Sequence, residues 1–198
     1  MEIAFSQSLA FSVALAIIAV VWISKYGTER KARKYSEGRE PILRDERFRK
    51  FGKVIFVVSN LVTLASFWIN SQALLPFCEN HWLRMAGMVV LIAATLLYFS
   101  SMKHLGENYS PCFDSHRPFR LVSRGAYKYV RHPIYLANIL LGVGYSLTSG
   151  SLWVLAFSSY GAFKMMRALE EEESYLSKNF PGYEKYQTTT SRLIPFIY

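Results

Sequence analysis

The sequence IYLANILLGVGYSLTSGSLWVLAFSSYGAF, residues 134–163, runs for 30 positions without a charged side chain. A membrane-spanning helix needs about 20 apolar residues, so this run is too long for one helix and slightly short for two. The polar residues Thr148-Ser149-Gly150-Ser151 interrupt the run near its middle. We therefore expect a tight helical hairpin whose two helices continue into the flanking residues.

Three further uncharged runs lie nearer the N-terminus, at residues 3–24, 54–75 and 85–102. Each is long enough for one membrane span, so with the hairpin they predict an all-α polytopic membrane protein of five transmembrane helices. The composition agrees, because 52% of the 198 residues are hydrophobic and only 19% are charged, whereas soluble domains are about a quarter charged. The first run follows Glu2 and precedes basic residues from Lys25 onward, so we expect a retained helix rather than a cleaved signal peptide.

The basic residues predict the orientation in the membrane. Residues 25–53, 103–131 and 164–198 hold 22 of the 23 Lys and Arg side chains, and Arg84 is the remaining one. With five spans these three stretches share one face, which the positive-inside rule identifies as cytoplasmic, so the N-terminus lies outside and residues 25–53 form a basic cytoplasmic loop. Anionic lipid headgroups then account for the net charge of +9. We expect membrane lipids and no nucleic acid as partners.

The sequence GAYKYVRHPIY, residues 125–135, concentrates polar chemistry at a point where the chain enters the membrane. Arg131 and His132 precede Pro133, and Pro is favoured as the first residue of a helix. Polar groups at a helix N-terminus can hold a ligand carboxylate. The same residues can equally be membrane anchors, with Tyr127 and Tyr135 as interfacial aromatics.

A second polar feature follows the hairpin, where Arg167 precedes four successive glutamates, Glu170–Glu173. Arg167 and Glu171 share a helix face at a spacing of four residues, and at most two of the glutamates can point inward. Taken alone, such a run is typical of a solvated helix end. The hairpin, however, brings it close to residues 125–135 on the same side, and charged groups gathered at a membrane boundary indicate a functional site.

These residues resemble the isoprenylcysteine carboxyl methyltransferase family, which is related to the phospholipid methyltransferases. The central match is Gly125-x-Tyr127-x-x-x-Arg131-His132-Pro133-x-Tyr135, followed by a hairpin and paired glutamates. The match extends to Leu105-Gly106-x-Asn108-Tyr109-Ser110 and Leu121-Val122 before it, and to Arg167-x-x-x-Glu171-Glu172, Phe180, Tyr183, Tyr186 and Arg192-Leu193-Ile194-Pro195 after it. We therefore expect residues 103–198 to form a methyltransferase core and residues 1–102 to supply three helices.

The resemblance implies methyl transfer from S-adenosylmethionine, without a metal, in a cytoplasmic pocket that a lipophilic acceptor enters from the bilayer. It implies Arg167, Glu171 and Glu172 as catalytic residues. Counting back from Phe180 instead favours the pair Glu172 and Glu173, so the inward-facing pair among Glu170–Glu173 stays open. The implied cofactor-binding residues are Leu121, Val122, Gly125, Tyr127, Arg131, His132, Pro133 and Tyr135.

The acceptor decides which residue does the chemistry. The family's acceptor, the carboxylate of an isoprenylated cysteine, needs a cation to hold it, and the guanidinium of Arg167 suits that role. The amine of a phospholipid would instead need a base, and a glutamate could serve. Two other possibilities are a nicotinamide-dependent reductase of the membrane sterol type, which shares a similar Arg-His-Pro-x-Tyr sequence, and a membrane protein without enzymatic activity.

Overall fold

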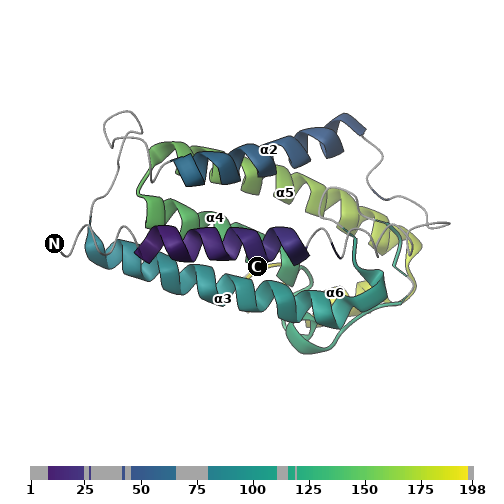
Figure 1. The fold of residues 1–198 in the computed structure, drawn as a ribbon. Coiled ribbons are helices and arrows are strands. Elements are labelled where there is room, and N and C mark those ends of the chain that lie inside the picture. Colours follow the sequence, from purple (N-terminus) through teal and green to yellow (C-terminus); the bar gives the residue numbers. More distant parts are fainter. Residues whose placement is uncertain are drawn as a thin grey trace.

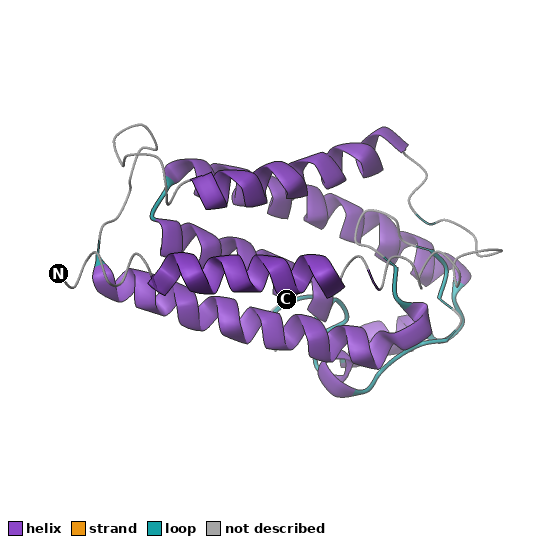
Figure 2. Ribbon diagram, in the orientation of Figure 1, coloured by secondary structure: helices purple, strands orange, loops and turns teal. Residues whose placement is uncertain are grey.

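A computed structural model describes residues 9–24, 27, 42, 46–65, 80–110, 116–118 and 120–195. This part of the chain is helical, and its long helices run side by side as an elongated bundle (Figures 1 and 2). A short helix and two 3₁₀ turns lie at one end of it. The elements are a helix at Leu9–Ser24, α2 (Glu46–Ala65), α3 (His81–Leu105), η2 (Gly106–Asn108), η3 (Gly125–Lys128), α4 (Pro133–Ser149), α5 (Leu152–Asn179) and α6 (Tyr183–Thr189).

The expectation of an all-helical protein is confirmed, since every uncharged run overlaps a helix. Among the described residues, α3 with its following turn, His81–Asn108, is long and apolar enough to cross a membrane, and Leu9–Ser24 is a shorter apolar helix. The count of five spans stays a prediction. The helix α2 begins at Glu46, inside the stretch 25–53 expected as a loop, and apart from Gly27 and Ile42 the rest of that stretch lies outside the described residues.

The predicted hairpin is formed by α4 and α5. Thr148 and Ser149 belong to the last turn of α4, and the chain reverses at Gly150 and Ser151. Gly150 has φ +65°, the left-handed conformation that commonly ends helices. The helix α5 then continues 16 residues beyond Phe163 to Asn179, which carries the glutamate run away from the apolar part of the bundle.

One apolar core joins the N-terminal helix to the hairpin. Ile17 and Val21 pack in the same buried cluster as Leu91 of α3, Leu141 of α4 and Val154 of α5. Residues from both sides of position 103 therefore share a core, while the expected division of the chain into residues 1–102 and 103–198 stays a prediction.

Glycines set a very close approach of α3 and α4. A Cβ atom on Gly144 would lie 2.7 Å from Cγ of Leu91, and one on Gly87 would lie 2.8 Å from the backbone nitrogen of Thr148. Small residues at such crossings let two helix backbones pack closely, as is common in membrane bundles. This contact fixes α3 and α4, the two helices on either side of residues 106–132.

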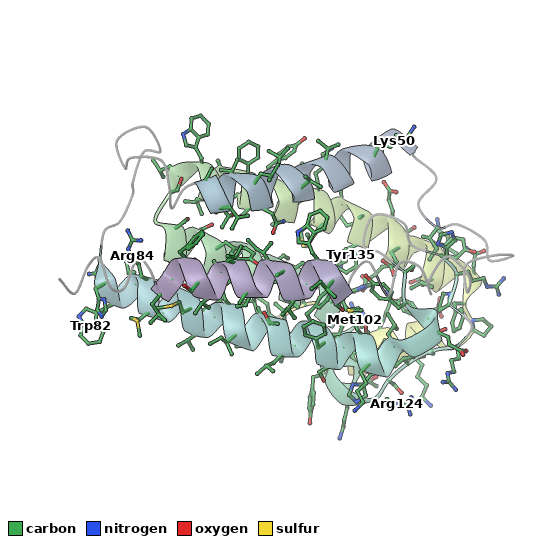
Figure 3. All side chains as sticks on the ribbon, viewed as in Figure 1. Lys50, Trp82, Arg84, Met102, Arg124 and Tyr135 are labelled. Atoms are coloured by element: carbon green, nitrogen blue, oxygen red, sulfur yellow. The ribbon has the colours of Figure 1, made fainter. Side chains whose placement is uncertain are left out.

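The two ends of the bundle differ in chemistry. Figure 3 shows Trp82 and Arg84 at one end and Lys50 and Arg124 at the other. Arg84 is buried and donates a hydrogen bond from Nη1 to the carbonyl oxygen of Thr148, 3.2 Å away. Between the ends, α3 exposes large apolar side chains such as those of Val89, Ile92 and Leu96.

Candidate active site

The two polar features of the sequence meet at the end of the bundle beside α6. The segment before α4 pairs with the C-terminal segment through an isolated parallel bridge between Val130 and Ser191. The backbone amide of Arg131 donates to the carbonyl oxygen of Ser191 at 2.8 Å. The backbone amide of His132 donates to the carbonyl oxygen of Arg192 at 3.2 Å. The C-terminal segment therefore holds the start of α4 in place.

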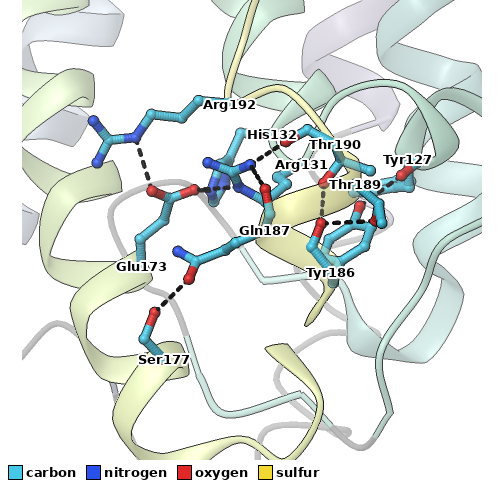
Figure 4. Close-up of polar contacts among 10 residues, drawn as sticks. All are labelled: Tyr127, Arg131, His132, Glu173, Ser177, Tyr186, Gln187, Thr189, Thr190 and Arg192. Carbon is cyan, nitrogen blue, oxygen red and sulfur yellow. Dashed lines mark hydrogen bonds and ion pairs between the residues drawn. The ribbon is translucent and has the colours of Figure 1, made fainter. Parts of the chain in front are cut away.

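Glu173 on α5 is the centre of this region, as Figure 4 shows. Its Oε1 lies 2.7 Å from Nε of Arg131 and 3.0 Å from Nε2 of His132, and its Oε2 lies 2.9 Å from Nε of Arg192. The Glu173 side chain is 8% exposed. One buried carboxylate therefore ties together α5, the loop before α4 and the C-terminal segment.

The charges around Glu173 determine its ionisation. Burial acts to raise the pKa of the carboxyl, but hydrogen bonds from His132 and Arg131, and the positive charges of both, outweigh it and lower the pKa to about 2. Glu173 is therefore a carboxylate at neutral pH, and its role is to bind its basic neighbours rather than to exchange protons.

Arg131 uses its remaining donors to anchor the C-terminal segment. Its Nη1 donates to the carbonyl oxygen of Gln187 at 3.1 Å and also to that of Thr190. The side chain of Gln187 in turn accepts a hydrogen bond from Ser177 of α5 at 3.0 Å. Arg131 thus acts in the structure as a clamp between the loop, α5 and the end of α6 (Figure 4).

A cavity of about 100 Å³ lies beside this cluster. It is bounded by the loop after α3, the start of α4, the far part of α5 and α6, so its walls come from segments distant in sequence. Aliphatic, aromatic and charged side chains all contribute. The lining residues are Leu105, Asn108, Ser110, His116, Pro118, Arg120, Leu121, Val122, Tyr127, Arg131, His132, Ile134, Tyr135, Glu172, Leu176, Tyr183 and Tyr186.

Two tyrosines at the cavity have fixed hydroxyl groups. The hydroxyl of Tyr135 donates to Oε2 of Glu172 at 2.9 Å, and the Tyr135 ring meets the ring of His132 edge to face with centroids 5.5 Å apart. The hydroxyl of Tyr186 donates to the carbonyl oxygen of Tyr127 at 2.6 Å. Burial raises the pKa of Tyr186 to about 12.

Most of the residues expected to bind a cofactor line this cavity: Leu121, Val122, Tyr127, Arg131, His132 and Tyr135. Pro133 is buried as the first residue of α4. Gly125 stands outside the lining and has φ +63°, and a Cβ there would lie 2.7 Å from the His104 ring. Gly125 therefore serves the packing of η3 on α3.

The three residues expected to be catalytic are separated by the structure. Glu172 lines the cavity, but Arg167 and Glu171 do not. The Arg167 side chain is 64% exposed, lies 3.8 Å from Glu170 and stacks over the ring of Phe163. Glu171 is exposed as well. Residues 172 and 173 face inward, which is the pair that counting back from Phe180 favours.

The sequence left Glu173 as an open alternative and gave no site role to three further residues, Arg192, Tyr183 and Asn108. Glu173 carried a signal in its spacing from Phe180, and Arg192 and Tyr183 lay in the C-terminal part of the family resemblance. Asn108, which donates to the carbonyl oxygen of Arg120 at 3.1 Å and so holds the loop over the cavity, had a weaker signal. All four lay in stretches that the resemblance or the glutamate run had singled out, but none had been assigned a role in the site.

Comparison with known proteins decides the family. The sequence pattern of the phospholipid methyltransferase family (PEMT) matches residues 82–182, just over half of the chain. The chain belongs to this family. The matched phospholipid methyltransferase region contains α3, the loop before α4, the hairpin and both inward-facing glutamates, and so includes most of the cavity.

Two curated relatives are similar to this phospholipid methyltransferase family member. The protein-S-isoprenylcysteine O-methyltransferase of Schizosaccharomyces pombe is 28% identical over 157 residues, which are 74% of this chain and 61% of that protein. The nickel-cobalt-cadmium resistance protein NccN of Alcaligenes xylosoxydans xylosoxydans is 32% identical over 77 residues, 38% of this chain and 36% of that protein. The chain thus matches less than two thirds of either relative's length.

A solved structure shares the fold. The eukaryotic intramembrane Ras methyltransferase, isoprenylcysteine carboxyl methyltransferase, superposes with a TM-score of 0.57 at 23% identity, covering 72% of this chain and 52% of that one. Together with the S. pombe relative and the family match, this shared fold confirms the resemblance to the isoprenylcysteine carboxyl methyltransferase family.

Proposed function

We propose that this protein is an integral membrane methyltransferase that transfers the methyl group of S-adenosylmethionine to a membrane-embedded acceptor. The observation that carries the proposal is that the phospholipid methyltransferase match and the cavity coincide. Residues from the loop before α4 and from the far part of α5, both within residues 82–182, face each other across it.

The cavity's residues fit such a cofactor. Leu121, Val122 and Tyr127 offer an apolar and aromatic wall to the adenosine, while His132 and Tyr135 offer polar groups to its other end. Arg131 lines the cavity as well and supports the loop through Glu173 and the C-terminal carbonyls. When bound, the sulfonium supplies an already activated methyl group, so the protein has mainly to align the reactants and exclude water.

Glu172 is the acidic residue best placed to act on bound ligands, because its carboxylate lines the cavity and is oriented by the hydroxyl of Tyr135. Glu171 is exposed, so we assign it no contact with the cofactor. Arg167 lies on the exposed face of α5 above Phe163, where its guanidinium could hold the carboxylate of an acceptor that approaches from the bilayer.

Two acceptor classes follow from these placements. The first is the carboxylate of an isoprenylated cysteine, or of a similar small lipophilic substrate, because the S. pombe relative is named a protein-S-isoprenylcysteine O-methyltransferase. A phospholipid amine is the second candidate, because Glu172 is a carboxylate in the cavity that can attract an ammonium and accept its proton, whereas Arg167 lies outside.

A binding and transfer experiment on the purified protein in nanodiscs tests the proposal. S-adenosylhomocysteine and S-adenosylmethionine are expected to bind, and a reduced nicotinamide is not. Transfer from methyl-labelled S-adenosylmethionine is then offered to a prenylated cysteine and to phosphatidylethanolamine in parallel. Binding of nicotinamide alone would replace the proposal with a reductase.

A further inference from the structure

The tyrosine hydroxyls at the cavity differ in their partners. Tyr135 donates to Glu172, and Tyr186 donates to the carbonyl oxygen of Tyr127. The hydroxyl of Tyr183 is buried, and within the part of the chain that the structure describes it has no hydrogen-bond partner. The Tyr183 side chain lines the same cavity although the residue is only 3% exposed.

An unpartnered buried hydroxyl needs an explanation, because folded proteins pair nearly all such groups. Burying a hydroxyl without a hydrogen bond is unfavourable, and the Tyr183 side chain would avoid the cost if it were a phenylalanine. A hydroxyl at a cavity wall is instead satisfied when a ligand supplies the missing partner. This pattern is common in binding sites, which are mostly apolar with a few placed polar groups.

The surroundings of Tyr183 define what kind of partner fits. Burial, and then the carboxylates of Glu173 and Glu172, raise the pKa of the Tyr183 phenol above its usual range, so the hydroxyl stays protonated and can donate. The Arg131 guanidinium acts on that pKa in the opposite direction, but more weakly than either carboxylate, so an anionic acceptor nearby is disfavoured. The partner is therefore a neutral hydrogen-bond acceptor, such as a ring nitrogen or a sugar hydroxyl, rather than a carboxylate or a phosphate.

The apolar neighbours of Tyr183 also favour an uncharged partner. Tyr183 packs in a buried cluster with Leu176 and Tyr186, and Leu121 packs against that cluster. Its ring meets the ring of Tyr186 with centroids 6.0 Å apart. An apolar wall with two aromatic rings suits a flat heterocycle better than the charged amino-acid end of a cofactor.

We infer that Tyr183 is a cofactor-binding residue whose hydroxyl donates a hydrogen bond to a neutral oxygen or ring nitrogen of the nucleoside part of the cofactor. The inference rests on the proposed function and deepens it. It gives the C-terminal segment, which Arg131 clamps onto α5, a direct part in recognising the ligand.

Tyr183→Phe tests the inference because it removes one oxygen and leaves the ring. Dissociation constants for S-adenosylhomocysteine and for 5′-methylthioadenosine, which lacks the amino-acid end, are measured on the full chain in nanodiscs. Both are expected to rise about tenfold, the equivalent of ~1.4 kcal/mol. The melting temperature without ligand is expected to stay the same or to rise, since the variant loses a buried hydroxyl that has no hydrogen-bond partner among the described residues.

Two control variants make the result specific. Tyr186→Phe removes a hydroxyl that has a protein partner, so it is expected to lower the melting temperature without ligand. Tyr129→Phe alters a tyrosine that is 54% exposed and outside the cavity. It is expected to change neither the dissociation constants nor the melting temperature without ligand.

Every other outcome would contradict the inference about Tyr183, its assignment to the nucleoside part, or the proposed function. Unchanged affinities of Tyr183→Phe, or a loss of ligand-free stability like that of Tyr186→Phe, would remove the inference and leave the proposed function standing. Weaker binding of S-adenosylhomocysteine alone would place the hydroxyl at the amino-acid end and so contradict the nucleoside assignment. Failure of the wild-type protein to bind S-adenosylhomocysteine would overturn the proposed function, and the inference with it.

Discussion

Glu173 and Arg131 stand 42 positions apart in the sequence, yet Nε of Arg131 donates to Oε1 of Glu173 over 2.7 Å. Their side chains are 8% and 11% exposed, so the ion pair is largely shielded from water. It joins the far part of α5 to the loop that lines the cavity. Because His132 shares the same oxygen, the pair also fixes the imidazole at the cavity wall.

Glu173→Gln is expected to be strongly destabilising. The substitution keeps the shape of the side chain but leaves three basic neighbours without their common carboxylate, and removing one partner of a buried ion pair costs about 3–5 kcal/mol. Chemical unfolding in detergent measures the change. Glu170→Gln, on the exposed face of α5, is the matched control and is expected to change the free energy of unfolding by less than about 0.5 kcal/mol. Equal effects of the two substitutions would contradict the central role of Glu173.

The stability of the protein is expected to fall in acid because of the same carboxylate. The pKa of Glu173 is lowered from 4.5 to about 2 on folding, so its stabilising contribution, ~3 kcal/mol, is fully present above pH 4.5. It is lost as the pH falls through about 2. Unfolding free energies between pH 7 and pH 2 measure this, and Glu173→Gln should lack that part of the acid dependence. Parallel acid profiles of the two proteins would show that other groups are responsible.

Glu172→Gln and Glu171→Gln are expected to separate the two neighbouring glutamates. Glu172 lines the cavity and accepts the Tyr135 hydroxyl, whereas Glu171 is exposed. With a phospholipid amine as the acceptor, methyl transfer should fall at least about 100-fold in Glu172→Gln, the scale of a lost acid–base group, and stay near wild type in Glu171→Gln. Both melting temperatures should remain close to that of the wild-type protein. The opposite order of activities would restore Glu171 to the site.

Gly125→Ala is expected to destabilise the loop before α4 for two reasons that a second substitution separates. The positive φ costs a residue with a Cβ about 1–2 kcal/mol, and the new atom would lie 2.7 Å from the His104 ring. In a His104→Ala background, the loss of unfolding free energy that comes from the steric clash should disappear, and only the cost of the positive φ should remain. A double-mutant cycle of unfolding free energies measures the coupling, and strict additivity would show that the two residues do not meet.

The membrane orientation can be read by cysteine labelling with an impermeant reagent in sealed vesicles. Arg124 is exposed and lies at the end of the bundle opposite Trp82 and Arg84 (Figure 3). If the basic stretches are cytoplasmic, Arg124→Cys should be labelled only from the cytoplasmic side, and Asn80→Cys, just before α3, only from the other. The native cysteines Cys78 and Cys112 would first be changed to serine. Labelling of both positions from one side would refute the five-span topology.

The apolar pattern of the sequence determined the helical bundle and the position of its hairpin. A helix satisfies the hydrogen-bonding groups of an apolar backbone internally, and in the described part of the chain each uncharged run overlaps a helix, with the run at 134–163 forming two. The interruption at residues 148–151 located the reversal to within two residues, because Gly150 readily takes the left-handed conformation that ends α4. The family motifs likewise placed most of the cavity-lining residues.

Which glutamates face inward was decided only by the tertiary structure. Four successive glutamates cover a full turn of helix, and their sequence spacing left two possible pairs. The packing of Ala168, Leu169 and Leu176 against neighbouring segments sets the rotation of α5 about its axis. This rotation turns Glu172 and Glu173 toward the loop before α4. It leaves Arg167 and Glu171 exposed. The C-terminal contacts of Arg131 and the burial of Tyr183 against Leu176 depend on the same packing, since they join segments that no local pattern of residues relates.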